Sequence, residues 1–170
     1  MIEKAEDAVA HLGLGTNLGD RESNLRKALE LLSAQPGVRL LRCSQVYETA
    51  PWGMVDQPHF LNSVAEVATA LAPDRLLDVC KGVERRMERQ PGARWGPRLI
   101  DVDILLYGSV VVRQPRLEIP HPRLHIRAFA LMPLAELVPD TVHPGLGKTI
   151  GELASAVEGR EGVVLADRQC

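Results

Sequence analysis

Hydrophobic and polar residues alternate most regularly between residues 100 and 107, which predicts a β-strand with two unlike faces. Asp101 and Asp103 fall together on one face. The other face carries the apolar residues Ile100, Val102, Ile104 and Leu106. Because proline is not tolerated inside a sheet, the strand is expected to begin after Pro97, near Arg98. Two neighbouring carboxylates repel each other, and a bound divalent cation removes that conflict.

An ordinary solvated strand face can also carry two acids, and a bare Asp-x-Asp favours that interpretation. The residues just upstream favour a binding site instead, because Arg94, Trp95 and Arg98 include the planar cations that a polyphosphate needs. Magnesium is usually held by one or two carboxylates together with phosphate oxygens of the substrate. The stretch therefore predicts a magnesium-assisted polyphosphate site.

The first part of the chain predicts a short buried strand over Val9–Leu14, a turn over Gly15–Asp20 and a helix over Arg21–Ala34 with Asp20 as its N-cap. The helix repeats apolar residues at helical spacing, at Leu25, Ala28, Leu29 and Leu32. Gly13-x-Gly15 is not interpreted as a dinucleotide fingerprint, because the third glycine comes one position late and the next strands look antiparallel.

The middle of the chain predicts two strands, over Val38–Thr49 and Phe60–Leu71, joined by a loop over 50–58. Phe60 and Asn62 share one face of the second strand. An aromatic ring and a carboxamide so placed can stack on a flat heterocycle and bond its edge, although such a pair is more often simple packing.

The remaining elements alternate helices with short strands. A helix is expected from Pro73, with a buried stripe formed by Leu76, Cys80, Val83 and Met87. A turn over Tyr107–Ser109 and a strand over Val110–Val112 come later in the chain. A helix over Ala128–Leu137 follows, and a last helix begins after the capping box of Thr149 and Glu152. This order predicts an α+β fold, a ferredoxin-like two-layer sandwich with a mostly antiparallel sheet and helices packed on it. We expect a single domain over residues 1–170.

Composition agrees with one globular domain, because 45% of the 170 residues are hydrophobic and 25% are charged. The apolar runs are far shorter than a membrane span and the first residues lack a signal-peptide pattern, so a soluble cytoplasmic protein with no membrane partner is expected. The three cysteines predict neither a disulfide framework nor a zinc site.

Charge is distributed unevenly. The net charge is −2, but residues 85–127 hold nine arginines against four acids, a surplus of +5, while the rest holds eleven basic against eighteen acidic residues. A positive segment in an acidic protein fits a small anionic ligand better than nucleic acid. A solvated basic face is the competing explanation.

Five segments together resemble the 6-hydroxymethyl-7,8-dihydropterin pyrophosphokinases of folate biosynthesis, over roughly residues 9–140. They are GTNLGD (15–20), YETAPWG (47–53), DQPHFLN (56–62), RWGPRLIDVDI (94–104) and IPHPRLHIRAF (119–129). The resemblance implies a monomeric ferredoxin-like enzyme that transfers the terminal diphosphate of ATP to the hydroxymethyl group of the pterin and releases AMP. It also implies two Mg²⁺ ions.

The resemblance assigns roles residue by residue. Asp101 and Asp103 match the metal ligands, and the pterin site corresponds to Thr49, Trp52, Phe60, Asn62, Asp101 and Phe129. The ATP side corresponds to Glu84, Arg89, Trp95, Arg98, Ile104, Arg116, His121 and Arg127. The catalytic set is Asp101, Asp103, Arg89 and Arg98. One departure stands out: the family often has Gly-Arg-x-Arg after the helix from Pro73, whereas here Arg89 takes the first arginine's role and the second has no clear equivalent.

Two other classes of function are open at this point. A nucleotidyltransferase also uses paired aspartates, but it usually places a Gly-Ser turn shortly before them, and it attaches AMP to the acceptor. A non-catalytic nucleotide-sensing module would bind ATP tightly without magnesium-dependent turnover, and it would leave Phe60, Asn62 and Phe129 without a role.

Overall fold

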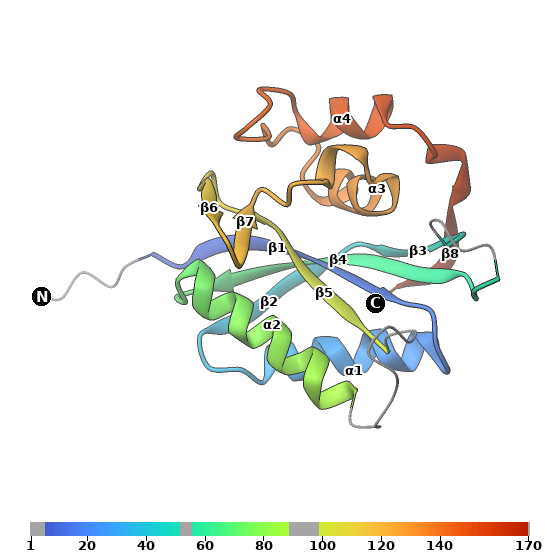
Figure 1. Cartoon of the computed structure of the whole chain (residues 1–170), viewed down its shortest axis with the longest axis horizontal. Helices are drawn as coiled ribbons and strands as arrows, with labels where there is room; N and C mark the ends of the chain where they lie inside the picture. Colours follow the sequence, from blue (N-terminus) through green and yellow to red (C-terminus); the bar gives the residue numbers. More distant parts are fainter. Residues whose placement is uncertain (1–5, 52–55, 89–98, 170) are drawn as a thin grey trace, which may run out of the picture.

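An antiparallel sheet of six strands forms the centre of the computed structural model, which describes residues 6–51, 56–88 and 99–169 (Figure 1). Its strand order is β5-β1-β4-β3-β8, with β2 also paired to β4. The strands are β1 (Ala8–Thr16), β2 (Val38–Cys43), β3 (Gln45–Thr49), β4 (Phe60–Thr69), β5 (Asp101–Tyr107) and β8 (Val163–Gln169). A separate hairpin consists of β6 (Val112–Gln114) and β7 (Leu117–Ile119).

Helices cover both faces of this sheet, as Figure 1 shows. The helices are α1 (Arg21–Ser33), α2 (Pro73–Met87), α3 (Ala128–Leu137) and α4 (Ile150–Ala156), with short 3₁₀ turns at Leu124–Ile126 and Arg160–Gly162. The α+β class and the ferredoxin-like arrangement are confirmed. A further layer, α3 with α4, lies on the face opposite α1 and α2.

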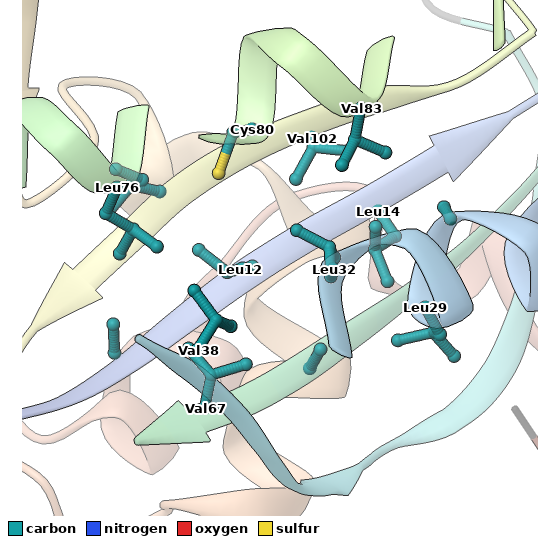
Figure 2. Close-up of a cluster of buried hydrophobic side chains, with 14 of the residues drawn as sticks. Leu12, Leu14, Leu29, Leu32, Val38, Val67, Leu76, Cys80, Val83 and Val102 are labelled. Carbon is teal, nitrogen blue, oxygen red and sulfur yellow. The ribbon is translucent and has the colours of Figure 1, made fainter. Parts of the chain in front are cut away.

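Two apolar cores hold these layers together. The first lies between the sheet and helices α1 and α2, where Leu12, Leu32 and Leu76 are almost fully buried (Figure 2). The second lies under α3 and α4 and contains Leu105 and Leu131. Burial of each leucine stabilises the fold by about 1.5–3 kcal/mol relative to its exposed state. Each face of the sheet therefore packs against its own apolar core.

Helix ends follow the predicted signals. Asp20 Oδ1 accepts the Ser23 N–H at 3.0 Å at the start of α1, and Pro73 occupies the first turn of α2. The Thr149 and Glu152 capping box is confirmed, with both reciprocal hydrogen bonds present. Such caps satisfy backbone N–H groups that a helix leaves without partners.

A bulge in β5 corrects one prediction. His11 and Leu12 of β1 pair with Leu106 and Ile104, so Leu105 is the extra residue. An extra residue reverses the alternation of side chains beyond it. Leu106 therefore packs in the second core instead of sharing a face with Ile104, which lies in the first core.

The predicted strand over Val38–Thr49 is two strands, separated at Ser44. The Ser44 N–H donates to Val64 O and the Ser44 hydroxyl accepts the Val64 N–H, each at 2.9 Å. Ser44 is therefore bound to β4 through both its backbone and its side chain. This interruption allows β2 and β3 to pair with different halves of β4.

Other boundaries shift for tertiary reasons. β1 continues through Thr16, so the predicted turn at Gly15 begins later, and β4 ends at Thr69. The strand predicted over Val110–Val112 overlaps the observed strand β6 (Val112–Gln114) only at Val112. Strand β8 was not predicted; it is an exposed edge strand whose pairing with β3 defines it.

Two further observations bear on composition. Cys80 is a free, buried thiol, whereas Cys43 is disulfide-bonded, which the odd number of cysteines did not predict. Burial raises the pKa of the Cys80 thiol to about 12 and so keeps it protonated. Within the described ranges, no helix has both the length and the apolar character that crossing a membrane requires.

Candidate active site

A cavity of about 260 Å³ lies where β1, β4 and β5 pass beneath the start of α3. It is lined by Gly13, Leu14, Gly15, Thr49, Ala50, Gln57, Phe60, Asn62, Ser63, Asp101, Asp103, Leu105, Arg127, Phe129 and Ala130. Pockets that combine apolar walls with a few convergent polar groups are the usual form of a small-molecule site. This cavity contains much of the set predicted from the sequence.

Strand register explains why the aspartates reach the cavity. Gly15 of β1 is opposite Asn62 on β4 and opposite Asp101 on β5, and Gly13 is opposite Asp103. Residues opposite each other across a sheet present their side chains on the same face. Asp101 and Asp103 therefore project on the same side as Asn62, and all three line the cavity.

The predicted pterin residues form one wall of the cavity and part of its polar floor. The Asn62 Nδ2 donates to Thr49 Oγ1 at 2.8 Å, and both residues are buried. Phe60 and Phe129 come from β4 and α3 and both line the cavity while remaining partly exposed. The structure thus brings together five residues of the predicted pterin site, Thr49, Phe60, Asn62, Asp101 and Phe129.

Arg127 is the guanidinium of the cavity. Its Nη1 lies 3.8 Å from Asp103 Oδ2, and its Cζ lies 5.6 Å from the centre of the Phe129 ring. Burial lowers the pKa of Arg127 from its ordinary value, while Asp103 opposes that shift. An arginine remains charged under these conditions, so this side chain offers a fixed cation beside the carboxylates.

His121 is held by its neighbours but does not line the cavity. Its backbone N–H donates to Leu105 O at 3.0 Å, and its Nδ1 accepts the Arg123 N–H at 3.1 Å. Burial, followed by the charge of Arg127, lowers the pKa of the His121 imidazole. The neutral ring therefore carries its proton on Nε2, where it can act as a donor.

Besides His121, three residues predicted on the nucleotide side do not line the cavity. Glu84 is 5% exposed and accepts the Val102 N–H at 2.9 Å. Ile104 belongs to the first core, and Arg116, in the turn between β6 and β7, donates to Asp78 at 2.5 Å. The nucleotide contacts of all three stay predictions.

Four predicted residues lie outside the described residues: Trp52, Arg89, Trp95 and Arg98. Their roles stay predictions as well. Arg94, which belongs to the same stretch upstream of the aspartates, also lies outside the described residues.

The donor set suits a magnesium ion shared with a substrate. In the described parts of the chain, no group of three or more His, Cys, Asp or Glu side chains is arranged to hold a metal. Asp101 and Asp103 both line the cavity and offer hard carboxylate oxygens, the ligand type that Mg²⁺ prefers. Mg²⁺ usually takes one or two carboxylates and completes its shell with water and phosphate oxygens.

Sequence reasoning missed the glycines of the cavity floor. Gly13 and Gly15 both line the cavity from β1. Glycine inside a strand often marks a close approach of a ligand or another backbone, and two glycines at alternate positions lie on one face. The spacing of the two glycines was the sequence signal that could have placed them in the cavity. Gln57 also lines the cavity, but no sequence signal of comparable strength pointed to it.

Comparison with known proteins identifies the family of this chain. The family model for 7,8-dihydro-6-hydroxymethylpterin-pyrophosphokinase (HPPK) matches residues 11–139. The chain is 46% identical over 136 residues to the 2-amino-4-hydroxy-6-hydroxymethyldihydropteridine pyrophosphokinase of Methylorubrum extorquens, covering 80% of this chain and 86% of the relative. It is 43% identical over 145 residues to the enzyme of that name from Aquifex aeolicus, covering 85% and 89%.

Solved structures share the fold. A crystal structure of an HPPK-DHPS in complex with substrates superposes with a TM-score of 0.72 at 14% identity, covering 89% of this chain. The chain spans 43% of that longer protein, so the likeness concerns one part of it. The family match covers most of the sequence, and the chain belongs to the 7,8-dihydro-6-hydroxymethylpterin-pyrophosphokinase family.

Proposed function

We propose that this protein transfers the terminal diphosphate of ATP to the hydroxymethyl group of 6-hydroxymethyl-7,8-dihydropterin and releases AMP, as a step of folate biosynthesis. The observation that carries the proposal is the cavity shared by Asp101, Asp103, Asn62, Phe60 and Phe129, which three different elements, β4, β5 and α3, supply. The family match supports the same reaction.

The pterin end of the cavity would hold a flat, polar heterocycle. Phe60 and Phe129 offer ring faces or edges for stacking, and the Asn62 amide offers a hydrogen-bonding edge. The Nδ2 of Asn62 already donates to Thr49, so its Oδ1 is the atom best placed to accept from the pterin. The hydroxymethyl group would then lie toward the aspartates.

The phosphate end depends on charge. Asp101 and Asp103 would hold two Mg²⁺ ions together with phosphate oxygens, and the bound metal would neutralise phosphate charge and lower the pKa of the pterin hydroxyl. Arg127 lies beside Asp103 and presents a planar cation to the phosphates. His121 and the predicted Arg89 and Arg98 would complete the set of donors, in which a single donor contributes about 3–4 kcal/mol to the transition state.

In the reaction, the pterin hydroxyl oxygen attacks the β-phosphorus of ATP. A new O–P bond forms, the bond from the β-phosphorus to the bridging oxygen of the α-phosphate breaks, and AMP leaves with that oxygen. The hydroxyl proton passes to a carboxylate, for which Asp101 is the proposed acceptor. The protein's share of catalysis is alignment and charge stabilisation, as in other phosphoryl transfers.

The direct test mixes the purified protein with Mg²⁺, ATP and 6-hydroxymethyl-7,8-dihydropterin and separates the products by chromatography. Free AMP and pterin diphosphate in equal amounts are the expected result. ADP would refute the reaction type, and AMP attached to the acceptor would indicate a nucleotidyltransferase instead. Removal of Mg²⁺ with EDTA should abolish turnover and excess Mg²⁺ should restore it.

We propose a monomer as the active unit, as the resemblance to the pyrophosphokinase family implies. Light scattering combined with size-exclusion chromatography at assay concentrations tests this point. A dimer that loses activity on dilution would contradict it.

A further inference from the structure

Gly15 lies at the middle of the cavity floor. It is opposite Asn62 on one side and Asp101 on the other, so it separates the amide from the first carboxylate. Its backbone is not in the left-handed region: Gly15 is absent from the glycines with positive φ among the described residues. Backbone conformation therefore does not explain why this position lacks a side chain.

Space does explain it. A Cβ added at Gly15 would lie 2.9 Å from Asn62 Oδ1. Such a contact is shorter than real Cβ atoms tolerate, so the alanine variant requires the amide to move. The effect on the site then depends on whether Asn62 can move without loss.

Asn62 is not free to yield. Its Nδ2 donates to Thr49 Oγ1 at 2.8 Å, and each of the two residues is only 6% exposed. Rotation of the amide away from residue 15 would break this buried hydrogen bond and leave buried polar groups without partners, which is unfavourable. Thr49 thus fixes which end of the amide faces the cavity, and Gly15 leaves the space for that orientation.

We propose that Gly15 is a specificity-determining residue for the heterocycle, and that Thr49 acts with it as a positioning residue for Asn62. The proposal rests on the function proposed above, since it takes the pterin to be the ligand read by Asn62. In this arrangement a methyl group on β1 would misalign the amide and reduce affinity for the pterin, while ATP would bind as before.

A second glycine provides an internal comparison. A Cβ at Gly13 would lie 3.3 Å from a terminal carbon of Leu105, which belongs to a flexible apolar side chain. Leu105 can adjust by a small rotation, whereas Asn62 is held by a hydrogen bond. Gly13→Ala should therefore weaken pterin binding less than Gly15→Ala does.

The experiment measures 6-hydroxymethylpterin binding by titration calorimetry in the presence of Mg²⁺ and a non-hydrolysable ATP analogue. Gly15→Ala should weaken pterin binding roughly 10- to 100-fold, the equivalent of about 1.4–2.8 kcal/mol, with the affinity for the ATP analogue changed less than about threefold. Gly82→Ala is the matched control, because a Cβ there meets only Arg85 at 4.0 Å and the residue lies on α2 outside the cavity. It should bind both ligands like the wild type.

A double-mutant cycle separates positioning from a general disturbance of the sheet. Asn62→Ser removes the Oδ1 that the new Cβ would meet, so Gly15→Ala should add less than about a twofold loss in that background. Multiplicative losses would overturn the proposal, as would equal weakening of pterin and ATP-analogue binding. Thr49→Val should weaken pterin binding and Thr49→Ser should restore it; a normal affinity in Thr49→Val would overturn the role of Thr49.

Binding is read without turnover, so the two proposals fail in different ways. A wild-type protein that binds the pterin but forms no AMP would refute the proposed reaction and leave the Gly15 result intact. A wild-type protein that does not bind the pterin would overturn the specificity role itself. Circular dichroism melts of each variant establish that it is folded.

Discussion

Glu84 gives the clearest quantitative test of how the fold supports the aspartates. Its Oε1 accepts the N–H of Val102, the residue between Asp101 and Asp103, at 2.9 Å. Lys81 Nζ lies 3.2 Å from both carboxylate oxygens. Burial is the largest influence and raises the pKa of Glu84, although the Val102 N–H and Lys81 oppose it. The buried charge is therefore costly, while the hydrogen bond to β5 is useful.

These opposing contributions predict different outcomes for two substitutions. Glu84→Gln keeps an acceptor for Val102 and removes the buried charge, so the free energy of unfolding should change by less than about 1 kcal/mol. Glu84→Met keeps similar volume but leaves the buried Val102 N–H without a partner. That variant should lose about 1–3 kcal/mol of stability. Val102 itself is fully buried, so water cannot replace the lost acceptor.

The same loss should appear in catalysis, because the start of β5 positions both carboxylates. A displacement of about 1 Å can cost up to about 100-fold in rate, so Glu84→Met should reduce turnover by about 10- to 100-fold while Glu84→Gln stays within about threefold. Urea unfolding followed by circular dichroism and steady-state AMP release measure the two effects. If the methionine variant matched the glutamine variant in both assays, the hydrogen bond to Val102 would have no supporting role.

Three further predictions concern other parts of the molecule. Asp103→Asn should reduce turnover at least about 100-fold with pterin binding largely retained, and a near-normal rate of AMP release would remove the metal pair from the mechanism. Arg127→Ala should lower kcat/KM for ATP by about 10- to 100-fold. Arg123 is exposed, so Arg123→Ala should change the same quantity by less than about threefold. Equal losses in the two variants would argue against a specific phosphate contact of Arg127. Burial lowers the pKa of His11, so the folded protein keeps this histidine neutral while the unfolded chain protonates it below about pH 6.5. The free energy of unfolding should therefore decrease as the pH drops below about 6.5, by at most about 1.4 kcal/mol per pH unit. Thermal melts of His11→Gln should show a melting temperature that depends less on pH.

Burial sets the sign of that last effect, because the contacts of His11 with Glu66 raise the pKa of the imidazole and burial outweighs them. The neutral His11 ring donates from Nε2 to Glu66 Oε2 at 2.8 Å, and Arg42 donates to both oxygens of Glu66. The hydrogen bond from Arg42 is the largest influence that lowers the pKa of Glu66, so the carboxylate stays charged well into the acid range. Its contribution to stability is lost only as the pH falls through this lowered pKa, below the window in which His11 acts.

Local chemistry was enough to predict several elements. The N-cap at Asp20, the apolar stripe of α1 and the capping box of Thr149 depend on residues within a few positions of one another, so their outcome is contained in short stretches of sequence. The alternation from Ile100 to Ile104 depends only on the period of a strand, and it placed Asp101 and Asp103 correctly on a common face.

Predictions failed where a distant segment decides the structure. Leu106 changed faces because pairing with His11 on β1 requires a bulge, and β8 exists because β3 offers it an edge. Neither fact has a local sequence signal.

The sequence by itself determined which residue types are present for the chemistry: paired carboxylates on one strand face, and an amide on the same strand face as an aromatic ring. It also determined the order of the five segments that resemble the pyrophosphokinase family. Only the tertiary structure decided that Asp101, Gly15 and Asn62 form one row across three strands. It also decided that Glu84 supports β5 from below. The physical reason is that strand register and side-chain packing join residues far apart in the chain, and these contacts depend on the whole fold at once.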